Sequence, residues 1–468
     1  MEMEIWRKSA LEIAGEIAER RISSREVVQA HLDRIAEVNP RVNAIVRVMA
    51  DDALRMADDA DNAVRSGVEL GALHGVPFTI KENIDVAGLP TTSGVPIFAE
   101  ALATSDAPTV ERMKAAGAIP IGRTNLPDMG LRIHTDSTLY GRTKNPWKSE
   151  HTAGGSSGGE GAALATGMSP IGLGNDIGGS LRNPAHACGI ATLKPSMGVI
   201  PHTNTYPSSN RTISSQFMLN QGVMARTIAD VRAGFSIVAG PDPRDPISLP
   251  VRLTGLNKGE RLTVAVMPNP PGGSTHPGIS AAVRRAADVL SDEGHRVVEV
   301  DAPDMELSYL LWACMLFNEL HDLRDQIELV MGDGGKTFID NALGQFPKLS
   351  TLEYSNMQAQ RDGLARAWSM WFQEYPIALL PTWTQPAFLA GWDIESLESS
   401  MGTAELMRPV LPGNLLGLPC AVTPAGMADG LPVGVQVMGW RYTDLRCLSV
   451  AEQIEGALGL ETPIDPRD

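Results

Sequence analysis

Serines in a glycine-rich stretch are the residues of this sequence best placed to do chemistry. Ten glycines fall between Gly154 and Gly179, in a stretch that contains Ser156 and Ser157 in GGSSGG and runs on to Ser180 in NDIGGS. Glycine loses more conformational entropy on folding than other residues, so this concentration indicates a backbone shaped for close approach. A serine hydroxyl is a weak nucleophile at its own pKa and needs a base beside it. The stretch therefore indicates either nucleophilic catalysis or a backbone cradle for phosphate.

Three familiar motifs explain the glycine-rich stretch less well. A P-loop needs a lysine after its glycines, and none follows here. GGSSG satisfies the G-x-S-x-G pattern of a nucleophile elbow, but the residues before it, NPWKSEHTA, are unlike a strand, and the last histidine, His321, lies far from the C-terminus. The S-x-x-K pattern of penicillin-binding enzymes is absent, because no serine has a lysine three residues later. The nucleophile elbow is the strongest of these three rivals.

A Ser-Ser-Lys arrangement is the fourth possibility. Lysine acts as a base only when it is neutral, and burial lowers its pKa enough to allow this. Lys81 follows the apolar run 76–80, which predicts a buried strand. A second serine can relay the proton, because a hydroxyl both donates and accepts. Composition alone does not single out Lys81 among the lysines.

Backbone N–H groups near Ser180 are placed to stabilise the negative charge that develops if Ser180 attacks a carbonyl carbon. The residues expected to form this oxyanion hole are Ile177, Gly178, Gly179 and Ser180. Gly178 and Gly179 have no side chains, so the backbone can come close to the substrate.

These residues lie in segments that resemble the amidase signature family of serine hydrolases. Residues 154–182, GGSSGGEGAALATGMSPIGLGNDIGGSLR, look like the signature of that family. Further similar segments are GVPFTIKENIDVAGLPTTSG around Lys81, GRTNLPDM at 122–129, GRTKNPW at 141–147, CGIATLKPSMGVI at 188–200 and NLLGLPCAVTPAGMADGLPVGVQVMG at 414–439. The resemblance runs from about residue 10 to residue 457 and is weaker in the middle third.

The resemblance implies a role for each member of the Ser-Ser-Lys set. The lysine of the family maps onto Lys81, its bridging serine, in a cis peptide, onto Ser156, and its nucleophile onto Ser180. The separations of these three positions agree with the family pattern. The activity implied is hydrolysis of carboxylic amides through an acyl-enzyme on Ser180, with esters and carbamates (urethanes) as further substrates.

The resemblance also implies supporting residues. Asp176 and Arg182 flank the nucleophile and are expected to brace its loop through hydrogen bonds. Met129 and Leu131 are expected beside the substrate pocket. No cofactor and no metal ion are implied.

Two positions depart from the pattern that is common in the family. Asn175 stands where many members carry threonine, and Glu160 stands where many carry serine. Glu160 matches the branch of fatty acid amide hydrolases, aryl acylamidases and urethanases better than it matches glutamyl-tRNA amidotransferase subunits. A glutaminase-type subunit of an amidotransferase complex remains the alternative function.

The elements that must position these residues alternate between strand and helix. Strands are predicted at 76–80, 118–121, 170–173, 262–267, 297–300, 377–380 and 433–438, and helices at 107–116, 227–238, 279–292 and 443–456. This order predicts an α/β fold, and the resemblance implies a large, mixed, mostly parallel twisted sheet with helices on both faces. We expect one amidase domain over residues 1–468, with residues 1–70 as a helical segment packed on it. Capping-box spacings at Ser9 and Ser23 begin two of its helices.

Composition limits the partners of the protein. The 468 residues carry a formal net charge of −16, which disfavours nucleic acid and anionic lipid as partners. Four widely spaced cysteines favour a reducing compartment. The N-terminus is unlike a signal peptide, and no apolar stretch is long enough to span a bilayer. We expect a cytoplasmic enzyme acting on a small molecule, without a membrane partner and with a homodimer as its assembly.

Histidines and tryptophans near these motifs have ordinary structural explanations. The mechanism requires no imidazole, so we expect packing roles for His134, His151 and His186. Four tryptophans can belong either to the pocket or to the core: Trp312, Trp371, Trp383 and Trp392.

Overall fold

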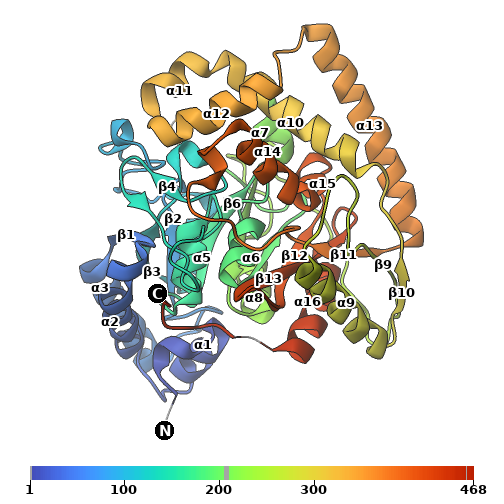
Figure 1. Ribbon diagram of the computed structural model, residues 1–468. Coiled ribbons are helices and arrows are strands. Elements are labelled where there is room, and N and C mark those ends of the chain that lie inside the picture. The colour runs from blue at the N-terminus through green and yellow to red at the C-terminus, as the bar shows by residue number, and fades with distance from the viewer. Residues whose placement is uncertain (1–2, 205–209, 460, 468) are drawn as a thin grey trace.

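The computed structural model describes residues 3–204, 210–459 and 461–467, and one large sheet organises them (Figure 1). The strands of this sheet are β1 (Ile45–Val48), β2 (Pro77–Lys81), β3 (Ile119–Thr124), β6 (Ile171–Asp176), β7 (Ala191–Lys194), β8 (Asn220–Ala225), β9 (Thr263–Val266), β10 (Arg296–Glu299), β11 (Ile377–Pro381), β12 (Cys420–Ala428) and β13 (Leu431–Gly439). They follow the order β1-β3-β2-β6-β8-β7-β12-β13-β11-β9-β10. A separate two-stranded ribbon joins β4 (Asp136–Ser137) and β5 (Gly141–Arg142).

Helices surround the sheet (Figure 1). The α-helices are α1 (Ala10–Ala18), α2 (Ser24–Val42), α3 (Ala50–Ser66), α4 (Pro108–Ala115), α5 (Gly158–Ala165), α6 (Arg182–Cys188), α7 (Ile213–Met218), α8 (Ile228–Val238), α9 (Pro277–Asp292), α10 (Met305–Asp322), α11 (Arg324–Val330), α12 (Asp333–Gln345), α13 (Thr351–Glu374), α14 (Leu397–Leu406), α15 (Leu411–Leu415) and α16 (Asp444–Leu458). Short 3-10 helices are η1 (Ile5–Arg7), η2 (Pro96–Phe98), η3 (Asp128–Gly130), η4 (Trp392–Ile394) and η5 (Arg408–Val410). Over the described ranges, no helix combines the length and the apolar character that crossing a membrane requires.

The sheet is mixed. Parallel pairs join β3 to β2, β2 to β6, β11 to β9 and β9 to β10. The six remaining neighbouring pairs, which include the whole centre of the sheet, are antiparallel. The predicted α/β class with one large mixed sheet is confirmed, and parallel pairing predominates only toward its two ends.

The predicted elements recur with small shifts at their ends. All seven predicted strands and all four predicted helices coincide with observed ones. Both predicted capping boxes, at Ser9 and Ser23, are present. The N-terminal segment 1–70 contains α1, α2 and α3, but it also contributes the edge strand β1, which the sequence did not predict. That residues 1–468 form one domain, with residues 1–70 as a segment packed on it, stays a prediction.

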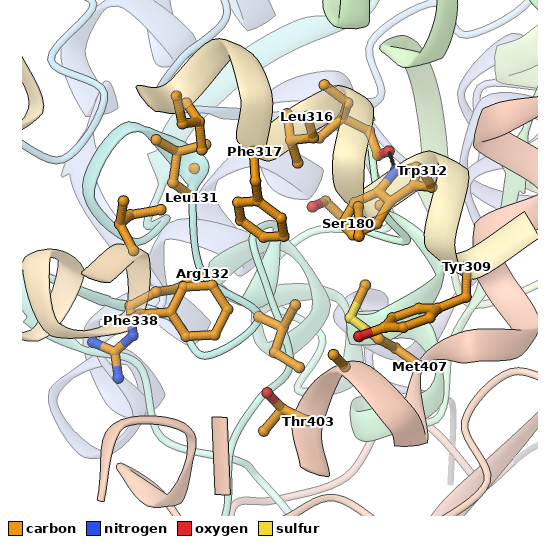
Figure 2. Close-up of a pocket in the computed structure, with 18 residues that line it drawn as sticks. Leu131, Arg132, Ser180, Tyr309, Trp312, Leu316, Phe317, Phe338, Thr403 and Met407 are labelled. Atoms are coloured by element: carbon orange, nitrogen blue, oxygen red, sulfur yellow. Dashed lines mark hydrogen bonds between the residues drawn. The ribbon is translucent and has the colours of Figure 1, made fainter. Parts of the chain in front are cut away.

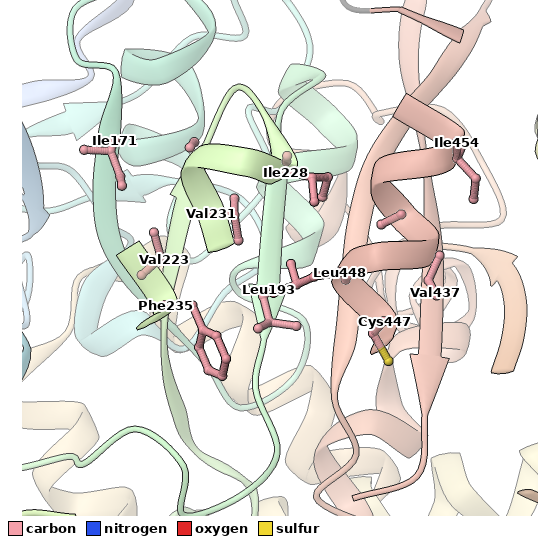
Figure 3. Close-up of a cluster of buried hydrophobic side chains, with 14 of the residues drawn as sticks. Ile171, Leu193, Val223, Ile228, Val231, Phe235, Val437, Cys447, Leu448 and Ile454 are labelled. Carbon is pink, nitrogen blue, oxygen red and sulfur yellow. The ribbon is translucent and has the colours of Figure 1, made fainter. Parts of the chain in front are cut away.

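An apolar core covers one face of the sheet (Figure 3). Helix α8 directs Ile228, Val231 and Phe235 toward the strands, and α16 adds Leu448 beside β13. The strands supply the matching side chains at every second position, as Val433, Val435 and Val437 of β13 illustrate. This packing makes the sheet a rigid base for the loops at its edge.

The opposite face is closed by α5 and α6, which pack against each other and against the sheet. Close approach is possible because α5 begins with glycines. A Cβ atom at Gly159 would lie 2.4 Å from the backbone nitrogen of Asn125. The glycine-rich stretch therefore serves, in part, the packing of α5.

A further group of helices, α10 to α14, stands beyond the edge of the sheet (Figure 1). Two buried carboxylates connect this group to the loop after β3. Asp393 accepts hydrogen bonds of 2.8 and 2.9 Å from the Arg132 guanidinium, and Asp128 accepts one of 2.8 Å from the Gly332 N–H. These contacts place α12 and α14 beside the loop after β3.

We predict opposite effects for two glycine-to-alanine changes in helices. Gly159→Ala should lower the free energy of unfolding by about 1–3 kcal/mol, because the added methyl group has no room. Gly363→Ala is the matched control, since Gly363 is exposed on α13 and no heavy atom lies within 4 Å of the added Cβ. This change should raise stability by about 0.5–1 kcal/mol. Thermal unfolding of both proteins by circular dichroism tests the pair, and equal melting temperatures would contradict the packing described for α5.

Candidate active site

Lys81 is the last residue of β2, and its side chain is completely buried. Its neighbours Phe78 and Ile80 belong to the apolar core. Alternation along the strand turns Lys81 to the opposite face. There Nζ lies 2.8 Å from Ser156 Oγ and 2.7 Å from Asn175 Oδ1. The structure thus brings the predicted lysine and the predicted bridging serine into direct hydrogen-bond contact.

Burial lowers the pKa of Lys81 to about 7, because the ammonium form is deprived of water. The negative charges of Asp176 and Glu160 act in the other direction and raise this pKa. A substantial fraction of Lys81 is therefore neutral near pH 7, which is the form that can accept a proton.

Ser156 lies in the turn that precedes α5, and the peptide bond between Gly155 and Ser156 is cis. The turn is tied to the loop that carries Ser180. The side-chain amide of Asn183 donates to the Gly155 oxygen at 3.1 Å and to the Gly178 oxygen at 3.2 Å. The Ser156 side chain itself is 2 % exposed. Its hydroxyl is thus held at a fixed place beside Lys81.

A buried ion pair shapes the loop of residues 176–182. Two nitrogens of Arg182 each lie 3.0 Å from an oxygen of Asp176, and both side chains are inaccessible to solvent. Burial alone would raise the pKa of Asp176, but Arg182 holds it at about 2. Asn414 donates a further hydrogen bond of 2.8 Å to the carboxylate. The loop-bracing geometry expected of Asp176 and Arg182 is present.

The N–H groups expected to form an oxyanion hole fall into two sets. The Gly179 N–H donates to Asp176 at 2.7 Å, so this group is occupied in this structure. The N–H groups of Ile177, Gly178 and Ser180 donate to no acceptor within the described ranges. These three amides are the ones available to a substrate oxygen.

Ser180 lines a cavity, and Ser156 lies next to Gly130 in the wall of that cavity. No hydrogen bond joins their hydroxyls in the part of the chain that the structure describes. The two loops are connected by the Ser157 N–H, which lies 3.3 Å from the Ser180 carbonyl oxygen. Gly130 lines the cavity that contains Ser180, and a Cβ atom there would lie 3.3 Å from Ser156 Oγ. Hydrogen bonds between catalytic groups are often long without substrate and shorten when substrate binds.

The cavity beside Ser180 is lined mainly by apolar and aromatic side chains (Figure 2). Its rings come from α10 and α12 and are Tyr309, Trp312, Phe317 and Phe338. The Trp312 indole donates to the Ile177 oxygen at 2.8 Å, which fixes α10 against the loop of Ser180. Leu131 lines this cavity, as expected from the sequence. Met129 instead borders a second, more polar cavity with Asn83.

The remaining tryptophans and the histidines lie outside this cavity. Trp383 is buried and stacks on Phe388, Trp371 packs against Trp368, and Trp392 borders outer cavities near α14. His134 and His186 are buried, and burial lowers the pKa of each to about 4. His151 lies near the surface beside Glu150.

Some residues of the site were not predicted from the sequence. Asn183 and Asn414 hold the loops that contain Ser156 and Ser180, and Tyr309 and Phe338 line the cavity. Asn414 had a signal, since it begins the segment that resembles the end of the family. Phe338 had none, because its helix lies outside every segment that resembles the family. Over the described ranges, no group of three or more potential metal-ligating side chains occurs.

Comparisons with known proteins agree with this geometry. A sequence model of the family described as Amidase matches residues 26–448. An indoleacetamide hydrolase from Bradyrhizobium diazoefficiens is 40% identical over 463 residues, covering 97% of this chain and 87% of its own. A glutamyl-tRNA(Gln) amidotransferase subunit from Salinispora tropica is 31% identical, covering 97% of this chain and 98% of its own. The crystal structure of a bacterial aryl acylamidase superposes with a TM-score of 0.83 at 27% identity, covering 96% of each chain.

The family match extends over most of the chain and includes every residue of the loops described above. The fold is that of the aryl acylamidase structure, and the indoleacetamide hydrolase is similar over nearly the whole chain. The chain belongs to the amidase family and is an enzyme that hydrolyses amides.

Proposed function

We propose that this enzyme hydrolyses uncharged primary amides of aromatic carboxylic acids, with arylacetamides as the first class, through an acyl-enzyme on Ser180. One observation carries the proposal. The Nζ atom of Lys81 contacts Ser156 Oγ at 2.8 Å in a buried site, directly beside the aromatic cavity that Ser180 lines.

In the first half of the reaction, Ser180 attacks the amide carbon. Its proton passes to Ser156, and the Ser156 proton passes to the neutral amine of Lys81. The carbonyl oxygen gains negative charge, and the free N–H groups of the 177–180 loop stabilise it. Lys81 then returns a proton through Ser156 to the amide nitrogen. The C–N bond breaks, and ammonia leaves from a primary amide.

In the second half, water replaces the amine. It loses a proton along the same route, adds to the acyl-enzyme carbon and displaces Ser180, which recovers its own proton. The products are the free acid and the unchanged enzyme. Esters and carbamates form the same tetrahedral intermediate, so they belong to the proposed substrate range.

The lining of the cavity supports an aromatic, uncharged acyl group. Four rings surround it, and aromatic groups pack favourably edge to face or offset. Arg132 is the one charged residue among those that line it, and its guanidinium is engaged by Asp393. The indoleacetamide hydrolase found in the comparison carries a name that fits such a substrate.

A glutaminase-type subunit of an amidotransferase complex is the second candidate, and the similarity to the amidotransferase protein favours it. Free glutamine carries an ammonium and a carboxylate group, both of which need polar or charged partners when buried. The apolar cavity offers few such partners, so we place this function second.

We further propose that the enzyme is cytoplasmic and forms a homodimer. The four cysteines are unpaired, which suits a reducing compartment. Light scattering after size-exclusion chromatography measures the assembly directly.

The first test identifies the nucleophile. A fluorophosphonate should label Ser180 of the purified enzyme, and Ser180→Ala should abolish labelling, because the reagent reacts only with an activated hydroxyl. Peptide mass spectrometry locates the label. An aromatic amide should slow labelling, whereas protection by glutamine alone would favour the amidotransferase function. A label on Ser156 would overturn the assigned roles.

The second test concerns the base. Because Lys81 must be neutral and its pKa is about 7, kcat/KM should fall about tenfold for each pH unit below that value. Lys81→Ala should remove amide turnover at every pH. Lys148→Ala is the control, since this lysine contacts the Asp429 carbonyl at the surface and should leave the profile unchanged. Amide turnover by a folded Lys81→Ala enzyme would exclude Lys81 as the base.

The third test concerns the substrate class. Phe338→Ala should lower kcat/KM for indole-3-acetamide about tenfold, because the ring loses an apolar contact worth about 1.4 kcal/mol. For propionamide the change should be less than about twofold, since a short chain does not reach that ring. Phe217→Ala removes an exposed ring of α7, outside the cavity, and should change neither value. Equal losses on both amides in Phe338→Ala would contradict the assignment of the cavity.

A further inference from the structure

Glu160 is a buried carboxyl group that the proposed mechanism does not use. It is the third residue of α5 and is completely inaccessible to solvent. Its two oxygens accept hydrogen bonds from the hydroxyls of Thr79 and Thr124, the latter at 2.8 Å. The carboxylate therefore lies against the sheet at the positions of these two threonines.

The same two threonines flank Lys81. Thr79 precedes Lys81 by two residues in β2, so both side chains leave the strand on one face. Thr124 is the register partner of Lys81 in the neighbouring strand β3. Glu160 thus occupies the same face of the sheet as Lys81, above the two strands that meet there.

A glycine in the sheet leaves room for the Glu160 carboxylate. Gly172 of β6 is the register partner of Thr79. A Cβ atom at Gly172 would lie 1.8 Å from Glu160 Oε1 and 2.8 Å from Thr79 Oγ1. Any side chain at this position would displace Glu160, so the glycine in β6 admits the carboxylate.

We propose that Glu160 is a positioning residue that acts through Lys81, as the buried counter-charge that keeps this lysine basic enough to take up and return the catalytic proton. The inference rests on the proposed role of Lys81 as the base. It assigns a catalytic purpose to a carboxyl group that contacts neither Ser156 nor Ser180 by hydrogen bonds.

The other carboxylates near Lys81 are paired with cations, although Asp176 still raises the pKa of Lys81 more than Glu160 does. Asp176, on β6, is paired with Arg182 through two hydrogen bonds. Glu82, which follows Lys81 in the chain, pairs with Arg123 at 3.2 Å. Glu160, by contrast, receives hydrogen bonds only from neutral hydroxyls within the described ranges. Its charge is therefore the one that Lys81 experiences without a cation in direct contact.

The titration of the two groups agrees with this geometry. Burial raises the pKa of Glu160 to about 7, while the threonine hydroxyls and Lys81 act to lower it. Burial brings the pKa of Lys81 to about the same value. Close to neutrality the two groups hold one proton between them, and the pair then has no net charge in either arrangement. This avoids an isolated charge in the interior, which would be costly.

A base that must also act as an acid works best with a pKa near the working pH. Without the carboxylate, burial would lower the pKa of Lys81 further. The lysine would then be neutral at lower pH but would bind the proton of the serine more weakly. Loss of the Glu160 charge should therefore shift the pH profile, whereas a general loss of structure should lower the rate without shifting the profile.

The experiment is the pH profile of Glu160→Gln with indole-3-acetamide. Glutamine keeps the size of the side chain and an oxygen that accepts from one threonine, but it has no charge. The acid limb of kcat/KM should move about one unit toward lower pH, and the plateau should fall by about threefold to tenfold, because a weaker base is neutral earlier but accepts protons less readily. The rate of fluorophosphonate labelling of Ser180 against pH gives the same readout without a substrate.

Two further variants make the test specific. Glu455→Gln is the matched control, since Glu455 is a partly buried carboxyl on α16 whose pKa burial also raises to about 7, and it accepts from the Ile228 N–H. Its acid limb should coincide with that of the parent enzyme. Thr124→Val removes one donor that stabilises the ionised Glu160, so its acid limb should move in the same direction by a smaller amount. This variant takes the place of Glu160→Gln if the latter does not fold by circular dichroism.

An unchanged acid limb, or a move to higher pH, would overturn the role of Glu160. This failure can be told from failure of the proposed function. If Lys81→Ala lacks amide turnover while the Glu160→Gln profile coincides with the parent, only the role of Glu160 is wrong. If Lys81→Ala retains turnover, the assignment of the base is wrong and the role of Glu160 is overturned with it.

Discussion

Removal of one lysine from water is the constraint on which the rest of the site depends. Lys81 ends a strand that is buried on both faces, and no water reaches its amine. An ammonium group in that position is unfavourable, so the lysine can serve as a base near neutral pH. The sheet core, the close-packed α5 and the loop of Ser180 all act to keep water away from this amine while leaving one hydroxyl in contact with it.

Charged groups and apolar groups lie on different sides of Ser180. On one side, the buried ion pair of Asp176 and Arg182 holds the loop, and Asp176 also accepts a hydrogen bond from the Gly179 N–H. On the other side lies the cavity, whose walls come from α10 and α12. The charged groups near Ser180 are thus mostly paired, and the cavity walls are mainly apolar rings and side chains. This division suits an uncharged amide with an aromatic acyl group.

Glycines allow close packing around Lys81 and Ser156. Gly159 allows α5 to approach the loop after β3, and Gly172 leaves space for the Glu160 carboxylate over β6. The contacts of Asp128 and Arg132 then fix the cavity helices to that same loop. Residues 125–132, which follow β3 and include η3, therefore connect the sheet, the Ser156 hydroxyl and the cavity beside Ser180.

The sequence by itself determined the α/β class and most strands, because alternation and helix caps are local signals, and its resemblance to the amidase signature family pointed to Lys81, Ser156 and Ser180 as a set. Strands β1, β7, β8 and β12 were missed. The last three contain polar residues, glycine or proline, so they lack the continuous apolar runs that marked the predicted strands. Only the tertiary structure decided which N–H groups near Ser180 are free and which rings line the cavity. It also decided that Glu160 lies on the same face of the sheet as Lys81. These properties arise from contacts between segments far apart in the chain, and no local pattern of residue types records such contacts.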